Sequence, residues 1–410
     1  MLEFSDRISS DEFAQLARHP DSPNAFTRSR KLPLPALIAA LLSMRNQSQQ
    51  AMLDSFFAAV CDTGLPLREV TDRAFAKARD RIHQPALISL NDLVVRRADE
   101  AGLIQRWCGL RVVAADASLL MPAVRPCLLS RSVAARDQRL FALFLPGAEL
   151  TLHTSVHSAT AAERSMLVAA LNVLGPDDVL VLDCGYPAAW LVALLNARGI
   201  RFVMRCDNNG SWRAAKSFTR SGQAQADESL NAPSADEVRD LGCPAGPPTL
   251  RLVRQVAPNG QVRLLATNLD AQAFPPELFG DLYHQRWRIE EAFKRLKHRL
   301  YLEAVSWLSQ QALIIDVAAK TLADNITSLM CAAASHLADL PARSRKCNRS
   351  YAAGLMQRLL PRLVLFIGNV LEDVTAAVQT LAATSRFVRG RSQPRPARHV
   401  KPHPASAYKG

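Results

Sequence analysis

The chain has 410 residues, of which 49% are hydrophobic, so it can bury a large core and divide into two or three domains. Its net charge of +13 favours a polyanionic partner, with nucleic acid ahead of a membrane surface. The longest apolar runs, 34–44 and 363–371, are too short to span a bilayer, and no signal-peptide pattern opens the sequence. The eight cysteines form no C-x2-C pair, which argues against a zinc ribbon or a secreted disulfide framework. We expect a cytoplasmic protein with no membrane partner.

The first 108 residues show helical periodicity and no strand pattern, which predicts an all-α region. The expected helices cover 11–18, 34–44, 48–61, 71–82 and 86–107, with Ser48 and Thr71 as N-caps. The fourth helix should bury Ala74, Phe75, Ala78 and Ile82 and expose a basic face of Arg73, Lys77, Arg79 and Arg81. Such a face suits docking on DNA, and it is at least as typical of an ordinary solvated surface.

Two apolar runs in the next segment each end in an aspartate. Asp116 ends the run 110–116 and Asp183 ends the run 178–183. Because buried strands do not bury an unpaired carboxylate, Asp116 is expected either at the exposed end of its strand or bound to something cationic. The patterns also predict strands at 138–145, 149–157 and 200–205 and helices at 161–174 and 187–198. Strand-terminal aspartates are common as caps, so these two acids alone do not decide between a structural and a catalytic role.

Residues 207–275 are predicted to be a β-rich insertion. The runs 250–256 and 261–268 alternate around Pro258-Asn259-Gly260, which is a hairpin signal. Trp212, in the polar first part, is a candidate for stacking on an unpaired base. An isolated tryptophan also commonly anchors a loop, so both roles stay open.

The segment 276–300 is predicted to form one amphipathic helix. At about 100° per residue, Tyr283, Arg286, Glu290 and Lys297 share one face about 60° wide. An apolar stripe lies beside this face, and a third side, expected to face solvent, consists of Gln285, Arg288, Arg295 and Arg299. A carboxylate held between a tyrosine, an arginine and a lysine suits chemistry on phosphodiesters, because the acid can bind a divalent metal while the cations grip phosphates. The alternative is that Arg286 and Lys297 are solvated charges and that Glu290 pairs with Lys294.

The spacing Y-x2-R-x3-E-x6-K, formed by these four residues, resembles the signature of the IS4-type DDE transposases. The resemblance covers most of the chain from about Phe26 onward. It implies an α/β fold with an RNase H-like mixed-sheet core and a β-rich insertion, flanked by an all-α N-terminal domain and C-terminal helices. In that fold the first and fourth strands are neighbours, which would bring Asp116 and Asp183 together with Glu290 as the third acid.

The resemblance also implies the roles of the site. Asp116, Asp183 and Glu290 would bind two Mg²⁺ ions, for which Mn²⁺ can substitute, while Tyr283, Arg286 and Lys297 hold the 5′-end phosphates. The expected function is cut-and-paste DNA transposition: cleavage of transposon ends by metal-dependent phosphodiester hydrolysis, followed by joining of the 3′-OH ends to target DNA. Excision through a hairpin intermediate is suggested less firmly. The expected partners are double-stranded DNA, as terminal inverted repeats and as target, and a second copy of the chain on paired ends.

The expected domains are an end-binding domain at 1–108 that includes Arg73 and Lys77, a catalytic domain at 109–300 with the insertion at 207–275, and a helical region at 301–384. Two helices are predicted at 310–340 and 351–383, the second kinked at Pro361. The tail 385–410 is basic and acid-free, which predicts disorder until it meets an anion such as DNA.

The sequence departs from the family pattern at two places. Ala117-Ser118 follows the first aspartate where glycine is often found, and Cys184 follows the second where arginine is frequent. The missing arginine puts one phosphate contact in doubt and leaves the metal site intact. Two other functions stay open: an inactive or domesticated transposase-derived DNA-binding protein, and a host RNase H-like nuclease.

Overall fold

The computed structural model describes residues 1–28, 30–44, 48–121, 138–207, 212–256, 260, 262–303 and 309–388. The chain divides into two compact units. The helical unit combines Met1–Ala101, Leu119–Gln138 and Phe293–Gly410, and the sheet unit combines Gly102–Ser118 and Arg139–Ala292. The predicted tail, 385–410, lies outside the described residues from 389 onward.

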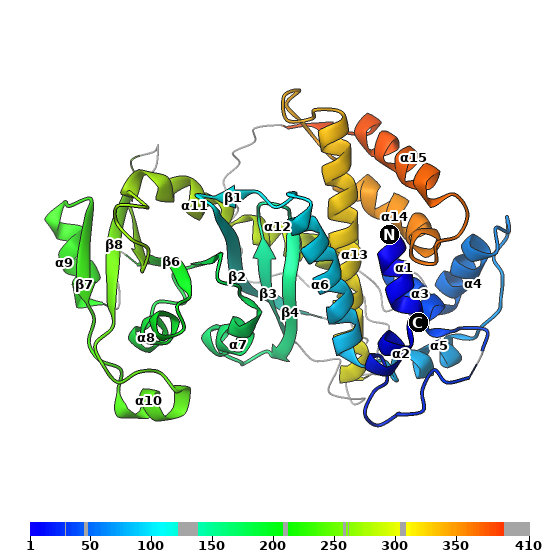
Figure 1. Cartoon of the computed structure of the whole chain (residues 1–410), viewed down its shortest axis with the longest axis horizontal. Coiled ribbons are helices and arrows are strands. Elements are labelled where there is room, and N and C mark those ends of the chain that lie inside the picture. Colours follow the sequence, from blue (N-terminus) through cyan, green and yellow to red (C-terminus); the bar gives the residue numbers. More distant parts are fainter. Residues whose placement is uncertain are drawn as a thin grey trace. The chain divides into compact units, whose positions relative to one another are not determined.

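The helical unit is built from both ends of the chain. Its N-terminal helices are α1 (Leu2–Ser9), α2 (Asp11–Leu16), α3 (Leu34–Ser43), α4 (Gln49–Val60), α5 (Asp72–Arg79) and α6 (Gln84–Glu100). Its C-terminal helices are α13 (Gln310–Leu337), α14 (Arg349–Val364) and α15 (Val370–Ala383), and a short pair of strands, β10 (Arg345–Lys346) and β11 (Arg386–Phe387), joins its last segment. Helices α3 and α6 pack against α13, and α3 also packs against α14, so one hydrophobic core holds all of them (Figure 1).

Local capping explains where two of these helices begin. The hydroxyls of Ser48 and Thr71 accept hydrogen bonds from the backbone N–H groups of Ala51 and Ala74, which confirms both predicted N-caps. The C-terminal prediction was wrong in one respect. Pro361 lies inside α14, which continues to Val364, and the chain turns only at 365–369, where Gly368 adopts a φ of 72°. The expected single kinked helix is therefore two helices.

The sheet unit contains one mixed sheet in the order β4-β3-β2-β5-β6-β9-β8-β7. The strands are β1 (Arg106–Trp107), β2 (Leu110–Leu120), β3 (Gln138–Leu145), β4 (Leu150–Ser158), β5 (Asp178–Leu182), β6 (Arg201–Cys206), β7 (Gln225–Ser229), β8 (Thr249–Val256) and β9 (Val262–Thr267). β2, β5 and β6 run parallel to one another, and the first five strands of the order form an RNase H-like sheet. The predicted fold class is confirmed.

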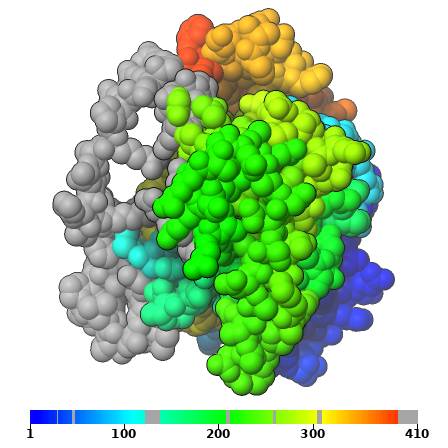
Figure 2. All heavy atoms as spheres, turned by 90° about the vertical axis from the view of Figure 1, so that its left-hand side faces the viewer, coloured from blue at the N-terminus to red at the C-terminus, as the bar shows by residue number. Residues whose placement is uncertain are grey.

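The insertion extends this sheet. β9 pairs antiparallel with β6 and β8 pairs with β9 through Val256 and Val262, so the predicted hairpin is confirmed. Two helices, α9 (Arg213–Ser221) and α10 (Ala235–Leu241), lie in the first part of the insertion, which the sequence pattern did not predict. Together with β7 and β8 they form the edge of the sheet unit that faces the viewer in Figure 2.

Helices cover both faces of the sheet. Helices α7 (Glu163–Ala170), continued by the 3-10 turn η3 (Leu171–Val173), and α8 (Ala189–Ala197) lie on one side of it, and α11 (Phe279–Gln285) lies on the other (Figure 1). Phe279, Leu282 and Tyr283 of α11 share a core with Val112 of β2 and with Val179 and Val181 of β5. Since side chains alternate along a strand, this contact identifies which strand positions face α11.

The predicted helix at 276–300 is interrupted. A 3-10 turn, η4 (Pro276–Leu278), leads into α11, then Arg286 and Trp287 form a turn before α12 (Arg288–Lys294), and a π-helical turn, η5 (Arg295–Arg299), follows. Ile289 and Glu290 donate backbone hydrogen bonds to the carbonyls of Arg286 and Trp287, three residues back, which tightens the chain here. The rotation of about 100° per residue in a regular α-helix therefore does not hold across the motif. The four motif residues consequently do not share one helix face in the way that the sequence predicted.

Candidate active site

The sheet places Asp116 and Asp183 side by side. Ala114 of β2 pairs with Val181 of the parallel strand β5, so two residues further on Asp116, inside β2, lies level with Asp183, which directly follows β5. The expectation that Asp116 ends its strand was wrong, because β2 continues to Leu120. Neighbouring strands lie about 4.8 Å apart. Side chains alternate along a strand, so Asp116 points to the same face as Val112 and Asp183 to the same face as Val181. Both valines pack against α11, which places the two acids on the face that α11 covers. The predicted adjacency of the first and fourth strands is thus observed.

Arg286 reaches these acids from the end of α11. Its Nη1 lies 3.5 Å from Oδ2 of Asp116, and the arginine is only 7% exposed. Its guanidinium also lies 6.0 Å from the centre of the Tyr283 ring. The alternative that Arg286 is a solvated surface charge is therefore wrong, because this cation is buried next to a candidate metal-binding acid.

Several buried polar atoms around the acids lack a hydrogen-bond partner among the described residues. They are the hydroxyls of Tyr186 and Tyr283 and the Nε and Nη1 atoms of Arg286. Tyr186 is fully buried, and this burial, together with the nearby acids Glu163, Asp116 and Asp183, raises the pKa of its hydroxyl. Buried polar groups are nearly always hydrogen-bonded, so unpaired donors gathered at one place indicate that a ligand completes the site.

The pKa of Asp116 is raised to about 6, mainly because the carboxyl is buried, and its acidic neighbours Asp183 and Glu163 add to the shift. The Arg286 guanidinium and the backbone N–H of Ala117 oppose it without cancelling it. Neutral Asp116 is thus favoured in the metal-free protein at mildly acidic pH. A cation bound near it would reverse this preference, because positive charge stabilises the carboxylate.

We expect the substitution Asp116→Asn to stabilise the metal-free chain increasingly as pH rises from about 4 to about 7. A folded-state pKa above the unfolded value means that ionisation of Asp116 destabilises the fold across this range, and asparagine removes that cost. At neutral pH the variant's free energy of unfolding should exceed that of wild type by on the order of 2 kcal/mol more than it does below pH 4, where Asp116 is protonated in both the folded and the unfolded state. Thermal unfolding in EDTA measures it, with the exposed-acid variant Glu291→Gln as control. A difference that is constant with pH would show that Asp116 titrates normally.

Glu290 is half-buried on α12, four residues after Arg286, while its neighbour Glu291 is exposed. The two acids provide a matched pair. We expect Glu290→Gln to abolish metal-dependent DNA cleavage and Glu291→Gln to change the rate less than about twofold, because an exposed carboxylate contributes little to a buried ion site. Cleavage of a labelled duplex by both variants tests this. If Glu291→Gln lost activity and Glu290→Gln did not, the motif acid would be Glu291, and the assignment to Glu290 would be wrong.

Lys297 belongs to the helical unit and is 7% exposed. Its Nζ donates to the carbonyl of Leu119 and lies 3.5 Å from Oε1 of Glu303, which also accepts from the backbone N–H of Met121. Lys297 is therefore no solvated charge. Arg295, expected on the solvent side, is also buried and forms an ion pair of 2.9 Å with Asp324, so that part of the helix prediction was wrong.

Among the described residues, no three carboxylate, imidazole or thiolate groups stand close enough to hold one ion. This does not disqualify Mg²⁺, which keeps several waters and is usually bound through one or two carboxylates. The adjacent pair Asp116 and Asp183 provides hard oxygen ligands, and the unpaired hydroxyls nearby can serve ion-bound water. The residues present fit a Mg²⁺ site.

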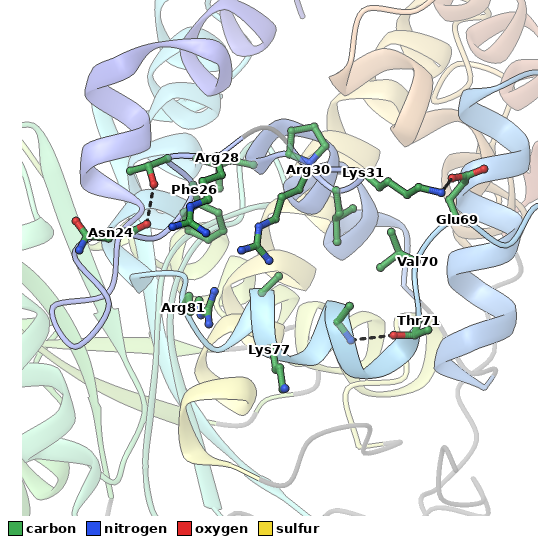
Figure 3. Close-up of a pocket in the computed structure, with 16 residues that line it drawn as sticks. Asn24, Phe26, Arg28, Arg30, Lys31, Glu69, Val70, Thr71, Lys77 and Arg81 are labelled. Carbon is green, nitrogen blue, oxygen red and sulfur yellow. Dashed lines mark hydrogen bonds and ion pairs between the residues drawn. The ribbon is translucent and has the colours of Figure 1, made fainter.

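The helical unit contains a basic pocket of about 730 Å³ between the loop 24–34 and α5. Arg28 and Arg30 enter it from the loop, and Arg81 faces them from just beyond α5 (Figure 3). Lys77 also lines it, with its amine directed away from the loop in this view. Glu69 is the one acid among the lining residues, and it pairs with Lys31 at 2.8 Å. The pocket therefore carries a net positive charge suited to phosphate.

The predicted basic face of α5 is partly correct. Arg73, Lys77 and Arg81 are exposed, as expected. Arg79 is buried, because it lies four residues after Phe75 and so on the same, core-facing side of the helix. Burial lowers the pKa of Arg79, while the nearby acids Asp316 and Asp80 act to raise it. Ala74, expected inside, is exposed. The face is consequently narrower than the sequence suggested.

We expect the double substitution Lys77→Gln and Arg81→Gln to weaken DNA binding about tenfold at low salt and to reduce the slope of log K against log salt by about two, since each phosphate contact contributes about one to that slope. Binding isotherms of the full chain at several salt concentrations measure both quantities. Arg358→Gln, an exposed arginine on α14, serves as control. Equal effects of the double variant and the control would mean that the pocket makes no specific phosphate contacts.

Trp212 is half-buried at the start of α9 and lines a second pocket of about 470 Å³ with Arg213, Glu228 and Asn231. Because the Trp212 ring lines a pocket, it could stack on a base that enters there. Because Trp212 directly precedes α9, it could equally anchor the start of that helix. Base stacking by Trp212 therefore stays a prediction.

Sequence reasoning missed two residues of this site. Glu163, at the start of α7, lies near enough to Asp116 to raise its pKa, and Tyr186 lies near enough to all three acids for them to raise its pKa, which burial raises most. Acidic residues are common in the first turn of helices, so nothing in the sequence distinguished Glu163 from an ordinary helix-start acid. Only the closeness of Tyr186 to Asp183 in the sequence could have singled it out.

Comparison with known proteins adds family information to this geometry. Residues 136–326 match the family described as Transposase DDE domain. This match supports a DDE transposase family for the chain and does not reach the finer IS4 assignment. The matched segment contains Asp183 and Glu290 and begins after Asp116, so the place of Asp116 in the site depends on the sheet register.

Among solved structures, the chain is similar to one described as "Cryo-EM structure of piggyBac transposase synaptic complex with hairpin DNA (SNHP)". The identity is 10%, the TM-score is 0.45, and the alignment covers 96% of this chain and 87% of that one. No curated protein matches the chain. Among the described residues, no helix is long and apolar enough to cross a membrane.

Proposed function

We propose that the chain is a DNA transposase of the IS4 type, which cuts the ends of its own mobile element and joins them to target DNA. The observation that carries the proposal is the pairing of β2 with β5, which puts Asp116 and Asp183 side by side next to a buried arginine of the motif helix. The match to the DDE domain supports the reaction class.

Each residue has a role that its position supports. Asp116, Asp183 and Glu290 would hold Mg²⁺, or Mn²⁺ in its place. When bound, the ions supply an activated water or 3′-OH and stabilise the leaving oxygen. Tyr283 and Arg286 lie where a strand end must come to reach Asp116, so they would orient its phosphates. Lys297 would add charge to the same strand only after leaving Glu303, its partner in this structure.

DNA binding is the second part of the proposal. The pocket beside α5, together with Arg73, would hold the duplex of the terminal inverted repeat, and a second copy of the chain would hold the other end. The N-terminal helices share their core with α13 and α14, so a fragment of residues 1–108 would expose that core. End binding is therefore best assigned to the helical unit as a whole.

The deciding experiment uses DNA from the two flanks of the gene. We expect Mg²⁺-dependent double-strand cleavage at the junction between short inverted repeats and flanking DNA, and joining of the released 3′ ends to a plasmid. Specific end binding without cleavage in Mg²⁺ or Mn²⁺ would indicate the inactive, domesticated alternative. Cleavage of DNA regardless of ends would indicate the host nuclease.

A further inference from the structure

We propose that Cys331 and Cys347 form a reversible disulfide that fastens the segment before α14 to α13. Sγ of Cys347 lies 2.9 Å from Sγ of Cys331 and donates a hydrogen bond to it. Both residues are thiols in this structure. A covalent S–S bond is about 2.0 Å long, which is about 0.9 Å shorter than this distance. The inference is independent of the proposed function, because neither cysteine belongs to the candidate active site or to the basic pocket.

Neighbouring contacts hold the two thiols together. Cys331 lies on α13, and Arg349, the first residue of α14, donates from Nη1 to the hydroxyl of Ser328 on α13 at 2.9 Å. Asn348, which directly follows Cys347, caps α14 by accepting from the backbone N–H of Tyr351. The backbone next to Cys347 is thus fixed to both helices. Two groups held in this way react as if each were present at a high local concentration.

The two thiols differ in exposure, which sets the order of the reaction. Cys347 is half-buried, whereas Cys331 is only 2% exposed. A small-molecule disulfide such as oxidised glutathione therefore reaches Cys347 first. The thiolate of Cys347 attacks one sulfur of the oxidant and expels the first glutathione thiolate. The thiolate of Cys331 then attacks Sγ of Cys347 and expels the second. The protein loses two electrons and two protons, and the oxidant becomes two glutathione thiols.

The bond would act on the segment that holds the last described part of the chain. Cys347 directly follows β10, which pairs with β11. Arg345 of β10 donates from Nε to the hydroxyl of Ser385 at 2.8 Å, and its guanidinium lies 4.3 Å from the centre of the Phe387 ring. A disulfide would close the loop 332–346 and join this strand pair covalently to α13. Such a cross-link stabilises the folded state, because it restricts the unfolded chain.

The test uses the full chain without DNA, equilibrated with mixtures of reduced and oxidised glutathione, then alkylated and digested for mass spectrometry. We expect one peptide pair joined through Cys331 and Cys347, which dithiothreitol separates. The oxidised chain should unfold about 5 °C above the reduced chain. Cys347→Ser should abolish both the cross-link and this shift. Cys61→Ser, which removes an exposed thiol elsewhere, is the matched control and should keep both.

Two outcomes would overturn the proposal. In the first, Cys347 carries glutathione while Cys331 is still alkylated, which would mean that the two sulfurs do not reach bonding distance. In the second, either residue is joined to a different cysteine. The buried Cys331 need not be replaced, because dithiothreitol alone returns the wild-type chain to its reduced form, and the comparison is then made on a folded protein. The readouts use no DNA, so a failure of the transposase proposal would leave them unchanged.

Discussion

Replacing Asp183 by asparagine should reduce Mg²⁺-dependent cleavage of an end-bearing duplex by about 10³-fold or more, because the amide keeps the shape of the side chain and loses the charge that holds the ion. The same result is expected for Asp116→Asn. Binding to the DNA ends should change little, since these carboxylates act on the ions and not on base edges. Cleavage and mobility-shift assays on one labelled duplex measure both effects.

Asp177→Asn is the matched control, because Asp177 is exposed and immediately precedes β5. It should cleave at the wild-type rate. Retained cleavage in Asp183→Asn or in Asp116→Asn would remove that residue from the site. A parallel loss of end binding would indicate a folding defect, which the thermal unfolding of each variant would reveal.

The two aspartates could be predicted because their signal is local: each ends an apolar run typical of a buried strand. For Asp183 that run ends where β5 ends, whereas β2 continues past Asp116 to Leu120. The observed register from Arg111 and Asp178 onward places the two acids level with each other. The strand order that makes the two strands neighbours was implied by the family resemblance, since the residues alone showed only two acids after two apolar runs.

The motif helix shows where this reasoning stops. Helical periodicity correctly placed Leu282, Ile289 and Phe293 in the core, but it assumed a constant rotation per residue. The tightened bonds at Arg286 and the π-helical turn after Lys294 depend on how each half of the segment packs. Tertiary packing decides such interruptions, and a pattern of residue types does not contain it.

Long-range contacts were equally invisible. The sequence divided the N-terminal and C-terminal helices into separate regions, whereas Leu37 of α3 and Leu360 of α14 lie in one core. Glu163 was missed for a similar reason, since the hydrogen bonds of Arg164 to the loop after Asp183 join segments that are far apart along the chain. Neither contact leaves a periodic signal in the sequence.

The burial of Arg286 sharpens the expectation for its conservative replacement. Arginine offers a planar fork of donors that can hold a phosphate through two parallel hydrogen bonds, whereas lysine offers a single charged point. In this structure the fork lies between Asp116 and the ring of Tyr283, with Nε and Nη1 free of hydrogen bonds among the described residues. Nε is thus available to a strand end that enters the site, while Nη1 already forms an ion pair with Asp116.

Arg286→Lys should therefore permit the first nick at a rate within about tenfold of wild type and slow the later steps by about 100-fold, because only those steps require a held and distorted end. Arg286→Ala should slow both, and Arg288→Lys, exposed two residues further on, should slow neither. The assay follows nicked, hairpin and fully cleaved products over time on one labelled duplex. Accumulation of nicked DNA with Arg286→Lys is the expected result. Uniform slowing of every step would instead contradict a role in holding the end, because the two-donor fork would then matter as much at the first nick as at the steps that follow it.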